Sequence, residues 1–330
     1  MVEGLGERRI IEILLDQLEV MPRVTVPFGD DASAVDLDDG RLAVMKTDML
    51  VGKTDVPPCM SLWQAARKAV VMNVSDLAAK GVRPAAILAS LGLPRGLTEG
   101  DIEQIGRGLN DGAREYGAYV LGGDTNEASD LVISCAAFGT CEKQFFVKRG
   151  GARPGDLVAV TGPFGKTAAG LKILLEGLPA SSKVKENLVN AVLMPQARLQ
   201  EGLILAQTRA VTASIDSSDG LAWSLHEISR ASRVGFIIEK LPIAQEAEEF
   251  AEAHGLNPAE LALYGGEEYE LVITVKAELW KRAEEAVKKI GGRITKIGLA
   301  TGEPTILFKE KRGIVPIEAR GWEHFKPHSK

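Results

Sequence analysis

The residues of this chain best suited to chemistry are aspartates that follow apolar runs and stand beside glycine, serine or threonine. The pattern occurs at Gly29-Asp30-Asp31, Thr47-Asp48, Ser75-Asp76, Gly123-Asp124-Thr125 and Asp216-Ser217-Ser218-Asp219-Gly220. A single such end is typical of an ordinary exit turn, because Asp, Gly and Ser favour turns. Five of them in one chain predict that the carboxylates converge on one acidic centre.

Converging carboxylates need cations, because two like charges 4 Å apart repel by roughly 4 kcal/mol at an effective dielectric of 20. The four histidines all lie in the last third of the chain, and the three cysteines form no CxxC pair. A centre built mainly from the first half is therefore an oxygen-only site, which favours Mg²⁺, Mn²⁺ or Ca²⁺ over zinc. Carboxylate-held metal ions with open positions commonly bind phosphates.

Several of these residues also have simpler explanations. Ser218 or Asp219 could be a plain helix N-cap, whereas Asp216 stands too early for that role. Glu267, after Gly265-Gly266, fits a solvated turn equally well. Arg149 and Lys68 are candidate cationic contacts to phosphate. The run from Val160 to Thr167 ends in GKT but lacks the first glycine of a phosphate-binding P-loop, so we interpret it as a strand-to-helix turn.

The elements that must position these residues can be predicted from local signals. Tyr119–Leu121 is expected to be a short buried strand leading into Gly122-Gly123. Asp38-Asp39-Gly40 predicts a hairpin between strands at 33–37 and 41–46, with Thr47 and Asp48 at the end of the second strand. Ser61 and Thr98 are expected N-caps of helices that end at Gly81 and Gly117. The segment from Gly4 to Leu18 predicts an amphipathic packing helix.

The chain of 330 residues predicts two domains, 1–150 and 151–330, divided in the polar Gly- and Pro-rich stretch 148–156. Hairpins mixed with crossovers predict a mixed sheet with helices on one face in the first domain. Alternating strands and helices predict a second α/β domain, with strands at 157–161, 235–238, 270–275 and 293–297. The fold class is therefore α/β, or α+β, in two parts.

Composition excludes other classes of function. The net charge of −6, without a basic stripe, argues against a nucleic-acid surface. No apolar run reaches the roughly 18 residues of a membrane helix, and no signal peptide is visible, so we expect no membrane association and a cytoplasmic protein. Cys59, Cys135 and Cys141 are expected to be reduced and buried.

The motifs GDDA, TDML, NVSDLAAKG, LGGDT, RPGD, SIDSSDGL and GGEEYEL occur in this order over nearly the whole chain. In this combination the chain resembles the thiamine-monophosphate kinases, in the superfamily of aminoimidazole ribonucleotide synthetase, selenophosphate synthetase and an ATP-using hydrogenase maturation protein. The resemblance implies a two-domain α/β subunit whose N-terminal domains pair into a homodimer through a shared β-barrel. ATP and several Mg²⁺ ions would lie in a cleft between the two domains.

The resemblance also implies roles for particular residues. Positions matching the family's metal ligands are Asp31, Thr47, Asp48, Asp76, Asp124, Asp216 and Asp219; of these, Asp31, Asp48, Asp124 and Asp219 are expected to be catalytic. Positions matching its nucleotide contacts are Gly123, Asp124, Arg149 and Ser218. Glu267 and Trp322 match contacts to the thiamine moiety. Asp55 stands where the bacterial kinases have a substrate-contacting histidine, and Lys46 stands where Ser or Thr is common.

The implied reaction transfers the γ-phosphoryl group of ATP directly to thiamine monophosphate, giving thiamine diphosphate. An ionised acceptor phosphate needs positioning and charge neutralisation more than a general base. Two alternatives stay open: a sister synthetase that forms an activated phosphate on another acceptor, and a non-catalytic nucleotide-binding protein of the same fold. A selenophosphate synthetase is disfavoured because the first cysteine is Cys59.

Overall fold

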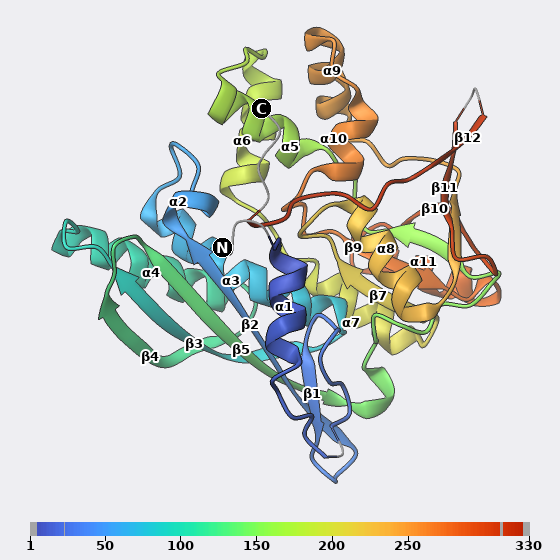
Figure 1. Cartoon of the computed structure of the whole chain (residues 1–330), viewed down its shortest axis with the longest axis horizontal. Helices are drawn as coiled ribbons and strands as arrows, with labels where there is room; N and C mark the ends of the chain where they lie inside the picture. The colour runs from blue at the N-terminus through green and yellow to red at the C-terminus, as the bar shows by residue number, and fades with distance from the viewer. Residues whose placement is uncertain (1–4, 23, 311–312, 326–330) are drawn as a thin grey trace.

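The computed structural model describes residues 5–22, 24–310 and 313–325. Two sheets divide the chain, and each is flanked by helices (Figure 1). The first sheet has the strand order β1-β2-β5-β3-β4. Its strands are β1 (Ser33–Asp36), β2 (Arg41–Val51), β3 (Arg83–Leu93), β4 (Tyr119–Glu127) and β5 (Val132–Glu142). Only the pair β3 and β4 is parallel, so the expected mixed sheet is confirmed.

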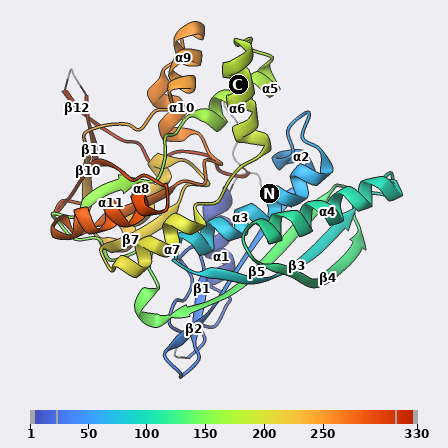
Figure 2. The ribbon, with the colours of Figure 1, turned by 180° about the vertical axis from the view of Figure 1, so that it is seen from behind.

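Two long helices cover one face of this sheet, α3 (Leu62–Ala79) and α4 (Glu99–Glu115) (Figure 2). Each begins with a capping box, Ser61 with Gln64 and Thr98 with Asp101, as the sequence predicts. α3 is buried along most of its length because it packs against the first sheet, α4 and part of the second half of the chain. It therefore delivers its polar side chains into the interior.

The second sheet has the order β12-β11-β8-β10-β6-β9-β7. Its strands are β6 (Leu157–Val160), β7 (Val211–Asp216), β8 (Gly235–Ile238), β9 (Leu271–Val275), β10 (Thr295–Thr301), β11 (Ile306–Glu310) and β12 (Gly313–Pro316). Its helices are α5 (Lys166–Glu176), α6 (Ser182–Leu193), α7 (Leu199–Thr208), α8 (Leu221–Ser232), α9 (Gln245–His254), α10 (Pro258–Tyr264) and α11 (Trp280–Lys289). The sequence predicts helices in this half near 167–175, 221–231, 245–254 and 278–290. It therefore missed three strands, β7, β11 and β12, and three helices, α6, α7 and α10.

A continuous apolar core joins the two halves. It contains residues of α3 and the first sheet together with residues of α7, β9 and α11, such as Val70, Leu205, Ile273 and Val287. The contact between α3 and the end of β7 belongs to the same junction. Side chains from both halves therefore meet beside α3, which is where the acidic residues gather.

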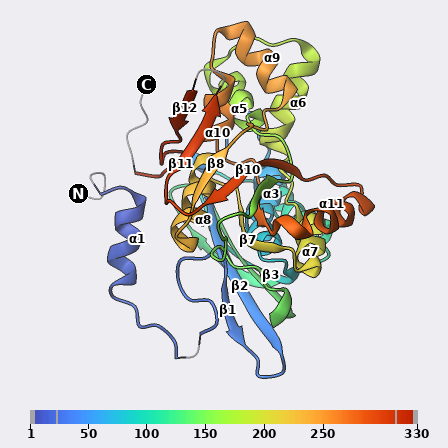
Figure 3. The same ribbon diagram turned by 90° about the vertical axis from the view of Figure 1, so that its right-hand side faces the viewer.

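Three local expectations were wrong. β2 runs on to Val51, so Thr47 and Asp48 lie within it rather than at its end. The helix near the N-terminus, α1 (Glu7–Leu15), has no buried residue and stands to one side of the molecule (Figure 3). Cys59 is exposed and Cys141 partly exposed, although all three cysteines are free. No helix within the described residues is long and apolar enough to cross a membrane.

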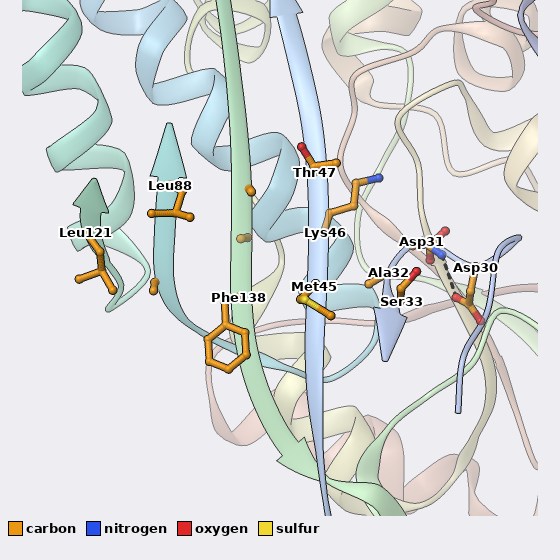
Figure 4. A pocket seen from close by; sticks show the side chains of 13 residues that line it. Asp30, Asp31, Ala32, Ser33, Met45, Lys46, Thr47, Leu88, Leu121 and Phe138 are labelled. Carbon is orange, nitrogen blue, oxygen red and sulfur yellow. Dashed lines mark hydrogen bonds between the residues drawn. The ribbon is translucent and has the colours of Figure 1, made fainter. Parts of the chain in front are cut away.

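The face of the first sheet opposite α3 and α4 is apolar and open. Its exposed side chains include Met45, Met49, Leu88, Leu121 and Phe138. A pocket of about 730 Å³ runs over part of this face as far as Asp31 (Figure 4). β4, expected to be buried, is instead the edge strand, and Leu121 is 70% exposed. A large open apolar face of this kind marks an interaction surface.

Candidate active site

Three buried carboxylates meet where the two halves of the chain join. Asp31 precedes β1, Asp76 lies on α3 and Asp216 ends β7, and each offers an oxygen within 4.8 Å of the others. The Ser75 hydroxyl donates a hydrogen bond of 2.7 Å to Asp216 Oδ2, which ties α3 to β7 directly. The expected convergence therefore occurs for these three aspartates.

Cationic side chains surround the cluster, defined here as Asp31, Asp76 and Asp216. Lys80, fully buried, places Nζ 2.7 Å from both Asp30 Oδ1 and Asp31 Oδ2, and donates to the Ser214 carbonyl. Arg149 pairs with Asp31 through its guanidinium and donates its backbone N–H to Asp30. The site is therefore a dense network of opposite charges.

On the β2 side, Lys46 and Asp48 join the same network. Lys46 Nζ lies 2.9 Å from Asp76 Oδ2 and 3.1 Å from Asp48 Oδ1. Asp48 is further held by its backbone N–H, which donates to Asn73 of α3 at 3.1 Å. Asp48 thus borders the cluster through a shared lysine.

The ionisation of these groups follows from burial and from their neighbours. Burial raises the pKa of Asp216 to about 7, with a further upward contribution from Asp31. Burial also raises the pKa of Asp76 well above its ordinary value, against the opposing charge of Lys46. For Asp31, burial acts upward, but Lys80 and Arg149 outweigh it and lower the pKa. A cation at the cluster would favour the ionised forms of Asp76 and Asp216.

The donor set fits magnesium. Asp31, Asp76 and Asp216 offer carboxylate oxygens, which are hard ligands. The neighbouring Ser217 hydroxyl is buried and has no hydrogen-bond partner among the described residues. Cys135 on β5 is buried, and burial raises the pKa of its thiol to about 12, so the thiol is protonated in the metal-free protein. These residues could hold one or more hard divalent cations, and carboxylate-held cations of this kind bind phosphates.

Thr47 points to the other side of the sheet from Asp48. Side chains alternate along a strand, and the Thr47 hydroxyl donates to the Cys135 carbonyl at 3.0 Å. Thr47 lines the open-face pocket instead of the cluster. Its assignment as a metal ligand thus receives no geometric support from a single chain.

Gly123 and Asp124 are also separated from the cluster. The pairing Asp48–Cys135–Ala89–Gly123 crosses the sheet from β2 to β4. Three strand spacings correspond to about 14 Å. A Cβ at Gly123 would lie 1.7 Å from the Ala89 carbonyl oxygen, so glycine is required there by strand packing. Asp124 follows on the exposed edge strand.

Ser218, matched to a nucleotide contact, and Glu267 and Trp322, matched to thiamine contacts, lie on neighbouring loops. Glu267 N–H donates to the Ser218 carbonyl at 2.6 Å, and Trp322 N–H donates to the Asp219 carbonyl at 3.1 Å. The loops that carry Ser218, Asp219, Glu267 and Trp322 are therefore adjacent. Glu267 has a left-handed backbone, with φ of 62°, which non-glycine residues adopt rarely and often at functional sites.

Lys68 connects these loops to α2 (Gly52–Asp55). Its Nζ, buried within α3, lies 2.5 Å from Glu267 Oε1 and donates to the Asp55 carbonyl at 2.9 Å. The Asp55 carboxylate accepts the Val51 N–H at 2.7 Å, so it closes the turn of α2. The sequence analysis treated Lys68 as a phosphate contact and missed this link. A lysine within an apolar helix was the available signal.

Comparison with known proteins identifies the family. The model of the AIR synthase related protein N-terminal domain matches residues 29–141, and that of the C-terminal domain matches residues 153–309. The thiamine-monophosphate kinase of Nitrosopumilus maritimus is 38% identical, covering 86% of this chain and 89% of the relative. That of Pyrococcus abyssi is 36% identical, covering 98% and 97%.

Solved structures agree with the sequence relatives. A structure described as "AaThiL complexed with AMPPCP and TMP" has a TM-score of 0.84 and 29% identity, covering 98% of each chain. The thiamine monophosphate kinase of Aquifex aeolicus has a TM-score of 0.79, also at 29% identity, covering 93% of this chain and 97% of that one. The expected two-domain fold is thereby confirmed. The chain belongs to the thiamine-monophosphate kinase family, built from the two domains of the AIR synthase related proteins.

Proposed function

We propose that this protein phosphorylates thiamine monophosphate to thiamine diphosphate, with ATP as the phosphoryl donor. The observation that carries the proposal is the meeting of Asp31, Asp76 and Asp216 in a chain that matches thiamine-monophosphate kinases along its length. A buried carboxylate cluster binds the cations that hold phosphates together. Family and site therefore point to the same chemistry.

We assign metal binding to Asp31, Asp76 and Asp216, with Asp48 beside them. Bound Mg²⁺ would neutralise the charge that develops on the phosphates during transfer. The chain's own part is positioning: Ser75 holds Asp216, and Lys80 with Arg149 holds Asp31. Thr47, Asp124 and Asp219 remain predicted ligands whose contribution depends on bound substrates or on a second subunit.

Substrate recognition is assigned to the adjacent loops. Ser218, Gly123 and Arg149 are the predicted nucleotide contacts. Glu267 offers a carboxylate to the permanently positive thiazolium ring, and Trp322 offers an aromatic face to the same cation. Asp55 acts on the substrate side through α2, since Lys68 joins its carbonyl to Glu267.

We also propose a homodimer that covers the open face of the first sheet. Its exposed Met45, Met49, Leu88 and Phe138 are what a shared β-barrel between two sheets would bury. Asp124 pairs with Ser90, which lies two residues after Leu88 on β3 and so shares the open face, and we assign the predicted role of Asp124 to the dimer. The division into domains at residues 150 and 151 is part of the same proposal.

Phosphorus NMR of the purified protein with ATP, Mg²⁺ and thiamine monophosphate tests the function, with each component omitted in turn. We expect thiamine diphosphate and ADP only when all three are present. ATP consumption without thiamine diphosphate would favour the sister synthetase. Nucleotide binding without ADP formation would favour the non-catalytic alternative.

A further inference from the structure

Lys46 lies between two carboxylates, those of Asp48 and Asp76. It precedes Asp48 by two residues on β2, so both side chains lie on the face of the sheet that packs against α3. Its Nζ contacts Asp76 Oδ2 at 2.9 Å and Asp48 Oδ1 at 3.1 Å, and its side chain is 20% exposed. The ammonium thus joins carboxylates from two separate elements.

The other cations around the cluster contact different carboxylates from those that Lys46 contacts. Lys80 and Arg149 engage Asp31, and Lys80 also engages Asp30. Asp216 accepts a hydrogen bond from the uncharged Ser75 hydroxyl. Lys80 and Arg149 therefore supply positive charge to Asp31, and Lys46 supplies it to Asp76.

An ammonium and a divalent ion compete for this position. Magnesium requires ligand oxygens at about 2.1 Å and would have to draw the Asp48 and Asp76 carboxylates together. Lys46 already bridges them with longer contacts and a single charge. Both cations cannot lie between the same two oxygens, since each needs to be their direct neighbour.

We propose that the Lys46 ammonium is a built-in cation of the carboxylate cluster, which takes the position between Asp48 and Asp76 and lowers the number of bound divalent ions by one. Lys46 is then a positioning residue that holds Asp76 while Asp31 and Asp216 complete a metal site beyond it. This inference rests on the proposed function, because it assumes that the cluster binds divalent ions.

The test is to count Mn²⁺ ions bound to the full-length protein without nucleotide, by electron paramagnetic resonance of the free ion. Lys46→Met keeps the length of the side chain and removes the charge, so we expect it to bind one more Mn²⁺ than the unmodified protein. Lys46→Arg should leave the number unchanged. An equal or smaller number for Lys46→Met would overturn the proposal.

A matched control and a second measurement keep the test decisive. Lys143→Met removes an exposed lysine that pairs with Asp36 at 2.6 Å, and it should leave the Mn²⁺ count unchanged. Lys46→Gln replaces Lys46→Met if circular dichroism shows that the latter is unfolded. In the unmodified protein, the nitrogen-15 ammonium resonance of Lys46 should persist at saturating Mg²⁺. Disappearance of this resonance on Mg²⁺ addition, which would mean that the ammonium has left the carboxylates, would contradict the inference.

The Mg²⁺ dependence of the kinase activity distinguishes a Lys46 that acts as a cation of the cluster from a Lys46 that only supports the fold. Because Lys46→Met removes the built-in cation, the variant should need severalfold more Mg²⁺ to reach its half-maximal rate. Its kcat should return towards that of the unmodified protein at saturating Mg²⁺. A lower melting temperature with no change in Mg²⁺ dependence or Mn²⁺ count would mean that Lys46 only supports the fold. Because Mn²⁺ is counted without substrate, an error in the assigned acceptor would leave that result intact.

Discussion

The charge of Asp216 should destabilise the metal-free protein, and this can be tested with Asp216→Asn. Asp216 is 4% exposed, and two other carboxylates lie within 4.8 Å. At that distance each ionised pair repels by roughly 3.5 kcal/mol at an effective dielectric of 20. Burial and then the charge of Asp31 raise the pKa of Asp216 from an ordinary 3.8 to about 7, which corresponds to roughly 4 kcal/mol. The Ser75 hydrogen bond and the charge of Lys46 act in the opposite direction and offset part of this cost.

Asparagine keeps the shape and still accepts the Ser75 hydrogen bond, at a cost of about 1 kcal/mol because the acceptor is neutral. In EDTA at pH 8 we therefore expect Asp216→Asn to be about 3 kcal/mol more stable than the unmodified protein. This corresponds to a melting temperature about 6 °C higher. Differential scanning calorimetry measures the difference.

Two further conditions test the same reasoning. Because the folded-state pKa is raised, the folded protein binds a proton more tightly than the unfolded chain. The metal-free unmodified protein should lose stability as pH rises from about 4 to about 7, and the advantage of Asp216→Asn should shrink towards pH 4. Saturating Mg²⁺ should stabilise the unmodified protein more than the variant. A variant that melts lower than the unmodified protein in EDTA at pH 8 would refute the argument.

Three other substitutions address different parts of the molecule. Arg198→Met leaves the buried Glu270 carboxylate without its bidentate partner. The free energy of unfolding in urea should fall by about 3–5 kcal/mol, and most of it should return when Glu270→Gln is added. An Arg198→Met variant as stable as the unmodified protein would contradict this. Glu267→Gln should raise KM for thiamine monophosphate about tenfold in steady-state assays and leave KM for ATP unchanged, because one charge-assisted contact is lost. A parallel rise in both constants would argue against a contact between Glu267 and the thiamine moiety. Asp124→Asn should lower kcat by orders of magnitude without changing the circular dichroism spectrum, since residue 124 is exposed, whereas an unchanged rate at saturating Mg²⁺ would remove Asp124 from the site.

Helix starts and the hairpin turn were predictable from the sequence because each depends on a few neighbouring residues. Ser61 and Thr98 begin helices because their side chains satisfy free N–H groups of the first turn. Asp38-Asp39-Gly40 closes a hairpin because Asp38 and Gly40 accept positive φ. The missed strands β11 and β12 are short and lie at the far edge of the second sheet, where neither length nor burial marks them in the sequence.

The sequence predicted an acidic, oxygen-only site, but it predicted only some of the residues that meet there. Asp31, Asp76 and Asp216 could be grouped because carboxylates beside glycine and serine recur where buried segments end. Asp124 follows the same pattern yet lies on an edge strand, since the order of strands depends on pairings far apart in the sequence. Thr47 was expected at the end of a strand, but β2 continues to Val51, and the face to which Thr47 points depends on pairing with β5.

The sequence alone determined the family, the oxygen-only character of the site and the caps and turns that start its elements, because each of these is written in residue type and short spacing. Tertiary structure decided which carboxylates meet and which cations face them. Lys68 and Lys80 stand beside apolar helix residues in the sequence, but nothing there shows which carboxylates Lys46, Lys68 and Lys80 contact. Their roles follow from the packing of α3 between the two halves of the chain, which removes water and leaves the carboxylates as their neighbours.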